Sequence, residues 1–167
     1  MLKTLVHELN FSGIRWWLTS GSLLGAVRDG ETCKGDTDID IAMYFEDAWA
    51  IKTLNIEHSI VKMFNGQTSY WTVPNGNLPI NIQCFFRIGD YRYYCEDDWM
   101  QDRLPQDVKL DKKMFNGVQC NIPIIYGQMF HEWFTDWQTP SSEIGQTKIY
   151  KIKFDRWENK WEDQKPH

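Results

Sequence analysis

The predicted fold rests on residues 14–44, which read IRWWLTSGSLLGAVRDGETCKGDTDIDIAMY. Residues 14–19 are rich in aromatic and β-branched side chains, and this composition predicts a strand. A Ser-Gly-Ser turn follows and supplies a serine that can cap a helix, so residues 23–28 predict a short helix. Residues 38–44 then alternate between polar and apolar side chains, which is typical of a half-buried strand. The stretch therefore predicts a strand, a tight turn, a helix and a second strand, in that order.

Two acids stand on one face of the second predicted strand. Asp38 and Asp40 are two residues apart, so their carboxylates point to the same side. At a separation of about 5 Å and an effective dielectric constant near 20, the two charges repel by about 3 kcal/mol. A cation between them removes this repulsion, and Mg²⁺ or Mn²⁺ takes carboxylate and phosphate oxygens as ligands. We therefore expect both acids to bind a divalent cation and to act in catalysis. The alternative is the solvated face of an edge strand.

The turn before the predicted helix is the candidate phosphate site. Gly21 and Ser22 lie where the backbone N–H groups of a helix start point at an anion, although the same pair also occurs in ordinary helix caps. Asp36 either points toward the same site, as a third catalytic acid, or caps the turn before the strand. Arg28 is suited to bind phosphate bidentately, and the alternative is a salt bridge to Asp29 or Asp36. We expect Arg28 and Asp29 to contact the substrate.

The remainder of the chain predicts more helices and an antiparallel meander. The spacing of apolar residues predicts a helix over residues 3–10, and two further segments, 46–54 and 128–137, also read as helices. Asn-Gly pairs favour hairpin turns, and the three pairs predict hairpins around strands at residues 59–64, 69–73 and 78–86, with the pairs at 65–66, 75–76 and 116–117. Residues 90–111 are polar and aromatic and predict loops. The expected fold class is α+β, a mixed or antiparallel sheet with helices packed on one face, in a single domain over residues 1–167.

The composition is that of a compact enzyme or binding domain. The chain has 167 residues, with 9 Trp, 7 Tyr and 9 Phe to fill a core. The net charge is −5 and no block of Lys or Arg stands out, so duplex nucleic acid is not an expected partner. The sequence contains no apolar stretch of about 18 residues, so no membrane-spanning helix is predicted. The first ten residues lack the long apolar run of a signal peptide, so the predicted location is the cytoplasm.

Two segments within residues 14–44 together resemble the LicD/fukutin family. Residues 17–30 read WLTSGSLLGAVRDG and are similar to the family's strand followed by G-[ST]-LLGA-x-R-x-G. Residues 35–41 read GDTDIDI and are similar to its W-D-x-D-x-D-I strand. Weaker similarity continues in residues 115–123 and 130–140. The ordered pair of segments is more specific than a lone Asp-x-Asp or a lone Gly-Ser.

The resemblance implies a nucleotidyltransferase fold and a metal-dependent transferase. Such an enzyme moves a phospho-alcohol, for example phosphocholine or ribitol phosphate, from a CDP-activated donor to a hydroxyl of a glycan or another acceptor. By the match of the motifs, Asp38 and Asp40 hold the metal ion. Gly21 and Ser22 contact the donor's phosphate, and Arg28 lies at the rim of the site.

One departure from the family pattern concerns a third carboxylate. The family has an acid on a later strand, in a pattern like I-D-I-F-P, whereas residues 80–86 here read INIQCFF. Asn81 and Gln83 share the outward face of that predicted strand, and we take both as candidate substrate-binding residues. An amide oxygen can ligate a metal, but an amide cannot take a proton from an acceptor hydroxyl. The absence of this acid bears directly on whether the protein can catalyse the transfer reaction.

Three functions stay open from the sequence. The first is the phospho-alcohol transferase with a CDP donor, which the LLGA-x-R segment favours. The second is a nucleotidyltransferase that moves a nucleoside monophosphate from an NTP to a small molecule. The third is a non-catalytic module that binds a nucleotide or sugar. The missing carboxylate favours the third, unless Asp29, Asp36 or Asp90 replaces it.

Overall fold

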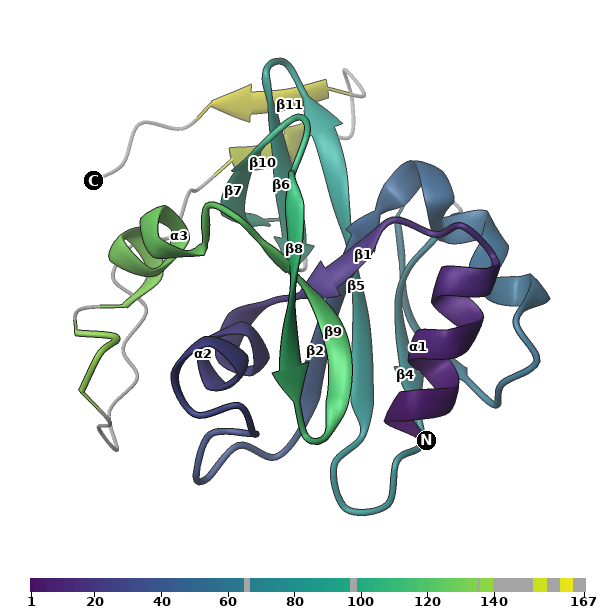
Figure 1. Ribbon diagram of the computed structural model, residues 1–167. Helices are drawn as coiled ribbons and strands as arrows, with labels where there is room; N and C mark the ends of the chain where they lie inside the picture. The colour runs from purple at the N-terminus through teal and green to yellow at the C-terminus, as the bar shows by residue number, and fades with distance from the viewer. Residues whose placement is uncertain (65–66, 97–98, 135, 140–151, 156–159, 164–167) are drawn as a thin grey trace.

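The computed structural model describes residues 1–64, 67–96, 99–134, 136–139, 152–155 and 160–163 (Figure 1). The helical segments are α1 (Leu2–Phe11), α2 (Ser20–Arg28), the 3-10 helix η1 (Phe45–Thr53) and α3 (Tyr126–Trp133). The strands are β1 (Trp16–Leu18), β2 (Ile39–Tyr44), β3 (Ser59–Phe64), β4 (Gln67–Val73), β5 (Ile80–Ile88), β6 (Tyr91–Glu96), β7 (Trp99–Pro105), β8 (Leu110–Phe115), β9 (Val118–Pro123), β10 (Ile152–Asp155) and β11 (Lys160–Asp163).

One mixed sheet organises the described part of the chain. Its main path runs β1-β2-β5-β6-β7-β10-β11, while β4 also pairs with β5 and β3 pairs with β4. β2 and β5 are parallel, whereas β1 with β2 and β4 with β5 are antiparallel. The prediction of an α+β fold with a mixed sheet is confirmed. Because β2 and β5 are parallel and in register from their first residues, the two strand starts lie side by side.

A hairpin and two helices pack near β1 and β2. The hairpin of β8 and β9 crosses the sheet between α1 and α2 (Figure 1), and it contacts both helices and β1. Leu2, Leu5, Val6 and Leu9 are the buried residues of α1, which confirms the helix predicted from their spacing. The side-chain amide of Asn121 on β9 donates to the Trp16 carbonyl at 3.0 Å. These contacts hold β1 in place, and β1 leads directly into the predicted phosphate turn.

Two of the three Asn-Gly predictions fall on described residues. Asn116 and Gly117 have φ values of 49° and 73°, and they join β8 to β9 as the predicted two-residue hairpin. A turn of this kind requires positive φ at both positions, which Asn and Gly tolerate best. The pair at 75–76 lies in a longer connection between β4 and β5, where only Gly76 has positive φ. The pair at 65–66 lies outside the described residues.

The prediction of loops over residues 90–111 is wrong. The segment forms β6 and β7, which pair with each other, and β6 also pairs with β5. Tyr93, Tyr94 and Leu104 are buried in the core. Polar residues placed between the aromatic ones hid the strand pattern, and pairing with the long strand β5 supplied the partner that the local sequence does not reveal.

Three smaller differences concern element type and boundaries. Residues 46–54 were expected as a helix, and η1 is helical but of the 3-10 type. α3 begins and ends earlier than the predicted 128–137. β2 is buried on both faces from Ile41 onward, so only its start matches the predicted half-buried pattern. Neighbouring elements therefore cover the far part of β2, while its acidic start is left accessible.

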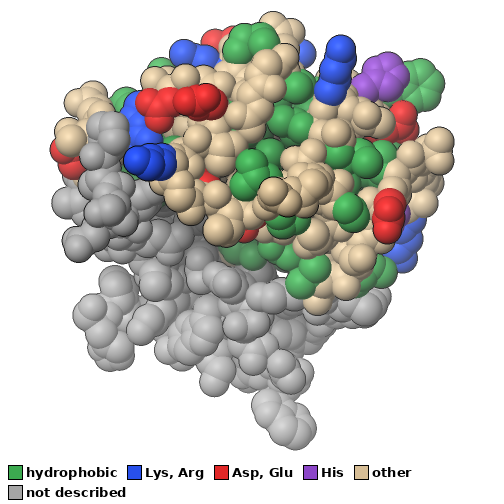
Figure 2. Space-filling view, turned by 90° about the horizontal axis from the view of Figure 1, so that it is seen from below, with side chains coloured by type: hydrophobic (Ala, Val, Ile, Leu, Met, Phe, Trp, Pro, Cys, Tyr) green, Lys and Arg blue, Asp and Glu red, His purple; other side chains and the backbone are tan. Residues whose placement is uncertain are grey.

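Large apolar side chains also reach the surface. Phe11 is 83% exposed and Trp49 is 71% exposed. On the face drawn in Figure 2, the apolar side chains of the described residues are interspersed with polar and charged ones. Scattered exposed apolar residues are normal for a globular protein and do not mark a docking surface. None of the helices among the described residues has the length and apolar character needed to span a bilayer.

Candidate active site at the start of β2 and β5

The two predicted acids lie where β2 begins. Asp38 immediately precedes the strand and Asp40 is its second residue, and both are partly exposed. The parallel register places Asp40 beside Asn81 and Ala42 beside Gln83. Side chains alternate across a strand, so the acids and amides project from the same face of the sheet. The structure thus brings together four residues that the sequence analysis selected from two distant segments.

Both carboxylates accept hydrogen bonds from the amides of β5. Asn81 Nδ2 donates to Asp38 Oδ2 at 2.9 Å and makes a longer contact of 3.5 Å with Asp40 Oδ1. Gln83 Nε2 donates to Asp40 Oδ1 at 3.1 Å. Asn81 and Gln83 are only 9% and 7% exposed. An amide is neutral, so these bonds hold the carboxylates without cancelling their charge.

A hydroxyl on a third strand extends this polar row. Thr72 on β4 is the partner of Asn81 in the antiparallel register, and its Oγ1 donates to Asn81 Oδ1 at 3.1 Å. The sequence analysis did not select Thr72. The expected strands at residues 69–73 and 78–86 contained the necessary signal, because a hairpin between them places alternate residues of the two strands on one face.

The predicted phosphate turn is joined to the acidic strand by two hydrogen bonds. The Asp40 N–H donates to Ser22 Oγ at 2.9 Å, and the Thr19 N–H donates to the Asp40 carbonyl at 3.1 Å. Ser22 is 1% exposed, so its side chain is committed to holding β2. Ser20, at the start of α2, has a φ of 50°, which is uncommon for a residue other than glycine. The first turn of α2 is therefore fixed beside the acids.

Asp36 lies against this turn. A Cβ placed on Gly21 would lie 2.8 Å from Asp36 Oδ2, so a larger residue at position 21 would displace the Asp36 carboxylate from the start of α2. Burial raises the pKa of Asp36, the neighbouring charge of Asp38 raises it further, and Arg28 opposes both effects. Asp36 is thus the third acid near the site, as one of the two sequence interpretations expected.

Arg28 forms the ion pair that was the alternative to phosphate binding. Its Nε lies 2.8 Å from Asp29 Oδ2, and its Nη2 contacts Cys33 Sγ at 3.5 Å. Asp29 is therefore engaged by Arg28 at the end of α2. Asp90 is exposed in the turn after β5, at the opposite end of the strand from Asn81. Asp29, Asp36 and Asp90 were considered as replacements for the missing carboxylate. Of these, Asp36 is the one whose pKa is raised by the neighbouring charge of Asp38.

The side chains at this site could bind a hard divalent cation through two carboxylates and an amide oxygen, rather than through three acids. Among the described residues, no group of three or more His, Cys, Asp or Glu side chains could hold a metal ion. Asp38 and Asp40 supply two carboxylates, and Asn81 and Gln83 carry amide oxygens of the kind that Mg²⁺ and Mn²⁺ accept. Gln83 Oε1 is buried and has no hydrogen-bond donor within the described part of the chain. A donor set of two acids and an amide oxygen is chemically suitable.

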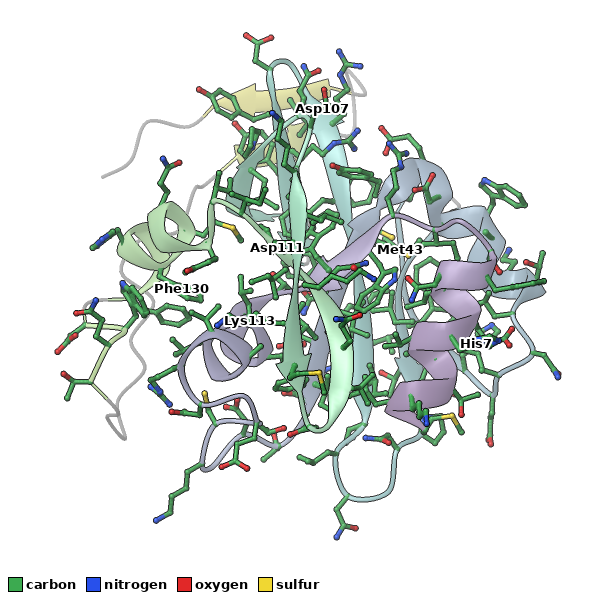
Figure 3. The ribbon with its side chains drawn as sticks, in the orientation of Figure 1. His7, Met43, Asp107, Asp111, Lys113 and Phe130 are labelled. Carbon is green, nitrogen blue, oxygen red and sulfur yellow. The ribbon has the colours of Figure 1, made fainter. Side chains whose placement is uncertain are left out.

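Other ionisable and aromatic side chains lie on the helices α1 and α3 and on the hairpin of β8 and β9. Figure 3 shows His7 on α1 and Phe130 on α3, on opposite sides of the hairpin that carries Asp111 and Lys113. His7 is exposed. The Phe130 ring packs on the Trp137 ring with their centroids 5.1 Å apart, so Trp137 is partly buried against the core.

The chain belongs to the LicD/FKTN/FKRP family: the nucleotidyltransferase domain described for this family matches residues 13–123. Over 45 residues the chain is 46% identical to the protein named ribitol 5-phosphate transferase FKRP in Mus musculus and in Homo sapiens. The matched stretch covers 27% of this chain and 9% of each relative. Membership in the family confirms the resemblance that residues 17–30 and 35–41 carry.

A comparison with solved structures gives a more distant similarity. The crystal structure of ANT(2″)-Ia in complex with adenylyl-2″-tobramycin aligns with a TM-score of 0.40 and 17% sequence identity. The alignment covers 78% of this chain and 75% of that chain.

Proposed function

We propose that the chain is a Mg²⁺- or Mn²⁺-dependent transferase that moves a phospho-alcohol from a CDP-activated donor to a hydroxyl group of a glycan or another acceptor. The single observation that carries the proposal is the hydrogen bond from the Asp40 N–H to Ser22 Oγ, at 2.9 Å. It fixes an acidic pair beside a helix start, which is an arrangement suited to a phosphate chain. Family membership supports the class of reaction.

Asp38 and Asp40 would hold the cation, which when bound neutralises charge on the donor's phosphates. The backbone N–H groups at the start of α2 have no acceptors within the helix, and around Gly21 they would donate to the same phosphates. Ser22 acts indirectly, because its hydroxyl holds β2 against the turn. Asn81 and Gln83 keep the two carboxylates oriented through their amide hydrogen bonds.

The reaction forms one P–O bond and breaks another. The acceptor oxygen bonds to the phosphorus that carries the alcohol, and the bond from that phosphorus to the bridging oxygen breaks. CMP leaves with the electron pair, and the acceptor's proton passes to a base. Asp36 is the candidate base, because its carboxylate lies against Gly21 at the start of α2, beside the proposed phosphate site. Asn81 stands where the family pattern has an acid, and it cannot serve as that base.

The same substitution favours one second candidate, a module that binds a nucleotide without turnover. Nucleotide specificity and metal dependence separate the candidates. We expect the melting temperature to rise with Mg²⁺ plus CDP more than with Mg²⁺ plus UDP, ATP or GTP, and this rise to disappear in EDTA. A response confined to ATP would instead support transfer of a nucleoside monophosphate. Stabilisation by CDP that is equal in EDTA would support the metal-free binding module and reject the proposed transferase.

A further inference from the structure

We propose that Asn81 is an ambidentate side chain in this site, with Thr72 as its positioning residue. Without a cation, the amide nitrogen of Asn81 holds the two carboxylates. With a cation, the amide turns over and its oxygen becomes the third protein ligand beside Asp38 and Asp40, while the Thr72 hydroxyl bonds the other end of the amide. The inference rests on the divalent cation of the proposed function and names how this chain completes the donor set without a third acid.

The distances around Asn81 match those between neighbouring metal ligands. Its Nδ2 lies 2.9 Å from Asp38 Oδ2 and 3.5 Å from Asp40 Oδ1. In an octahedral shell with Mg–O bonds of about 2.1 Å, adjacent ligand oxygens lie about 3 Å apart. The two ends of an amide have nearly the same shape, so a half-turn places Oδ1 where Nδ2 now lies. An oxygen there would face two carboxylates, which is favourable only when a cation lies between them.

Thr72 can bond the far end of the amide in both orientations. Its hydroxyl now donates to Asn81 Oδ1 at 3.1 Å. A hydroxyl both donates and accepts, so after the half-turn the same oxygen accepts from Nδ2 over the same separation. Asn81 is 9% exposed, and leaving a buried amide end without a partner costs about 1–3 kcal/mol. The hydroxyl at position 72 removes this penalty from both states.

Gln83 provides an independent observation that the polar row of acids and amides on β2 and β5 is suited to bind a cation. Its nitrogen is bonded to Asp40 Oδ1 at 3.1 Å, whereas its buried Oε1 lacks a donor among the described residues. Most buried polar atoms in folded proteins are hydrogen-bonded, so such an oxygen calls for an explanation. Here it lies in a row where two carboxylates and two amides supply more oxygen acceptors than amide N–H donors. That excess of oxygen acceptors is what a hard cation satisfies.

The test measures Mn²⁺ affinity of the full chain by electron paramagnetic resonance, which counts free Mn²⁺ and needs no turnover. Leucine has nearly the shape of asparagine, so Asn81→Leu removes the amide with little change in volume. If the amide oxygen is a ligand, Asn81→Leu binds Mn²⁺ at least about tenfold more weakly than wild type. If the amide nitrogen merely occupies the place of the cation, removing it leaves the affinity unchanged or raises it, and the inference is overturned.

Asn121→Leu is the matched control. Asn121 lies on β9, outside the polar row of acids and amides. Like Asn81, it donates a side-chain amide hydrogen bond, in this case to the Trp16 carbonyl on β1. We expect this control to keep the Mn²⁺ affinity of wild type within about twofold, since it loses a similar hydrogen bond away from the acids. An equal loss in both variants would show that damage to the fold, not ligation, explains the Asn81 result, and would overturn the inference.

The hydroxyl at position 72 gives a second test that does not alter the ligand. Thr72→Val is expected to weaken Mn²⁺ binding by about tenfold, and Thr72→Ser to retain it. Equal affinity in the valine and serine variants would reject the role of the hydroxyl, even if Asn81→Leu did not fold. Absence of Mn²⁺ binding by wild type would remove the cation of the proposed function as well. Binding that is lost in Asp38→Asn but unaffected in Asn81→Leu would remove only the present inference.

Discussion

The two ends of β2 carry polar clusters of opposite character. At its start, Asp38 and Asp40 accept hydrogen bonds from neutral amides of β5. At its end, the Tyr44 ring lies between two guanidinium groups, 4.3 Å from Arg15 and 3.9 Å from Arg92. Those arginines pair in turn with acids of η1, Asp47 at 2.9 Å and Glu46 at 2.8 Å.

The difference separates stability from binding. At the end of β2 each arginine has an acid, so the charges are matched within the chain, and the cluster ties the residue before β1 to β2, β6 and η1. At the start of β2 the amides of Asn81 and Gln83 that bond the two acids are neutral, so these hydrogen bonds do not cancel the charge of the carboxylates. A cluster in which each arginine pairs with an acid stabilises the fold, whereas two acids held by neutral amides at an accessible strand start are suited to a cation and phosphates.

The largest expected effect comes from neutralising one acid at the start of β2. Asp38→Asn should reduce Mn²⁺-dependent CDP binding by about 100-fold or more, because it removes a charged ligand. Isothermal titration calorimetry with and without EDTA measures this change. Asp47→Asn, at the other end of the strand, is the control and should leave binding unchanged while lowering the free energy of unfolding by about 1 kcal/mol or less. Unchanged binding in Asp38→Asn would remove the assigned site.

Two glycines of α2 allow stability and binding to be tested separately. In Gly25→Ala the new Cβ would clash with the Glu31 backbone carbonyl, which cannot move without shifting the chain. We expect the free energy of unfolding to fall by about 2–3 kcal/mol, as in other overpacked sites. In Gly21→Ala the new Cβ meets the end of the Asp36 side chain, which can rotate away. Denaturant unfolding should therefore show a smaller loss for Gly21→Ala, and calorimetry should show weaker CDP binding.

Replacing the buried Arg92 tests the cluster of paired charges at the end of β2. Arg92 is 6% exposed, donates to the Gln106 carbonyl at 2.7 Å and pairs with Glu46. Arg92→Met keeps much of the side-chain length but loses these bonds and the contact with the Tyr44 ring. We expect a loss of about 2 kcal/mol in the free energy of unfolding, measured with urea. Affinity for Mn²⁺ and CDP should stay at the wild-type value in this variant, and a parallel loss of binding would mean that the two clusters are coupled.

The smallest expected effects have opposite signs at the two clusters. For Glu46, burial raises the pKa but the hydrogen bond from Arg92 and its charge outweigh it, so the pKa lies below the usual 4.5. Its ionised form therefore adds stability above about pH 4.5, and this is lost as pH falls through the lower folded value. The pKa of Asp36 lies above the usual 3.8, so its ionised form subtracts stability at neutral pH, and the penalty fades as the pH falls below the folded value.

These signs predict opposite shifts in melting temperature at pH 7. Glu46→Gln should lower it and Asp36→Asn should raise it, each by an amount equal to about 1 kcal/mol or less. Both differences should shrink as the pH falls through the folded pKa of each carboxyl. Scans of thermal unfolding from pH 3 to pH 8 measure the two curves. Shifts of the same sign for both variants would contradict the contrast between the two clusters.

Some features of this chain follow from local sequence. The spacing of Leu2, Leu5 and Leu9 determines a helix face, and the Asn116-Gly117 pair determines a hairpin because both residues accept positive φ. The order of strand, helix and acidic strand in residues 14–44 follows from composition and periodicity, and it also reveals the family, whereas the turn predicted at residues 20–22 is the first turn of α2. Each of these depends on neighbours in sequence. The cytoplasmic location stays a prediction.

Other features were decided by tertiary structure alone. Of the strands over residues 90–111, β6 forms because β5 offers it a partner, β7 pairs with β6 in turn, and no local signal names these partners. The parallel register that sets Asp40 beside Asn81, and the antiparallel one that sets Thr72 beside it, join residues about 40 and 10 positions apart in the chain. The sequence therefore determined which acids and amides the site contains. Only strand pairing decided which of their atoms meet, because hydrogen-bond register depends on long-range packing rather than on local preference.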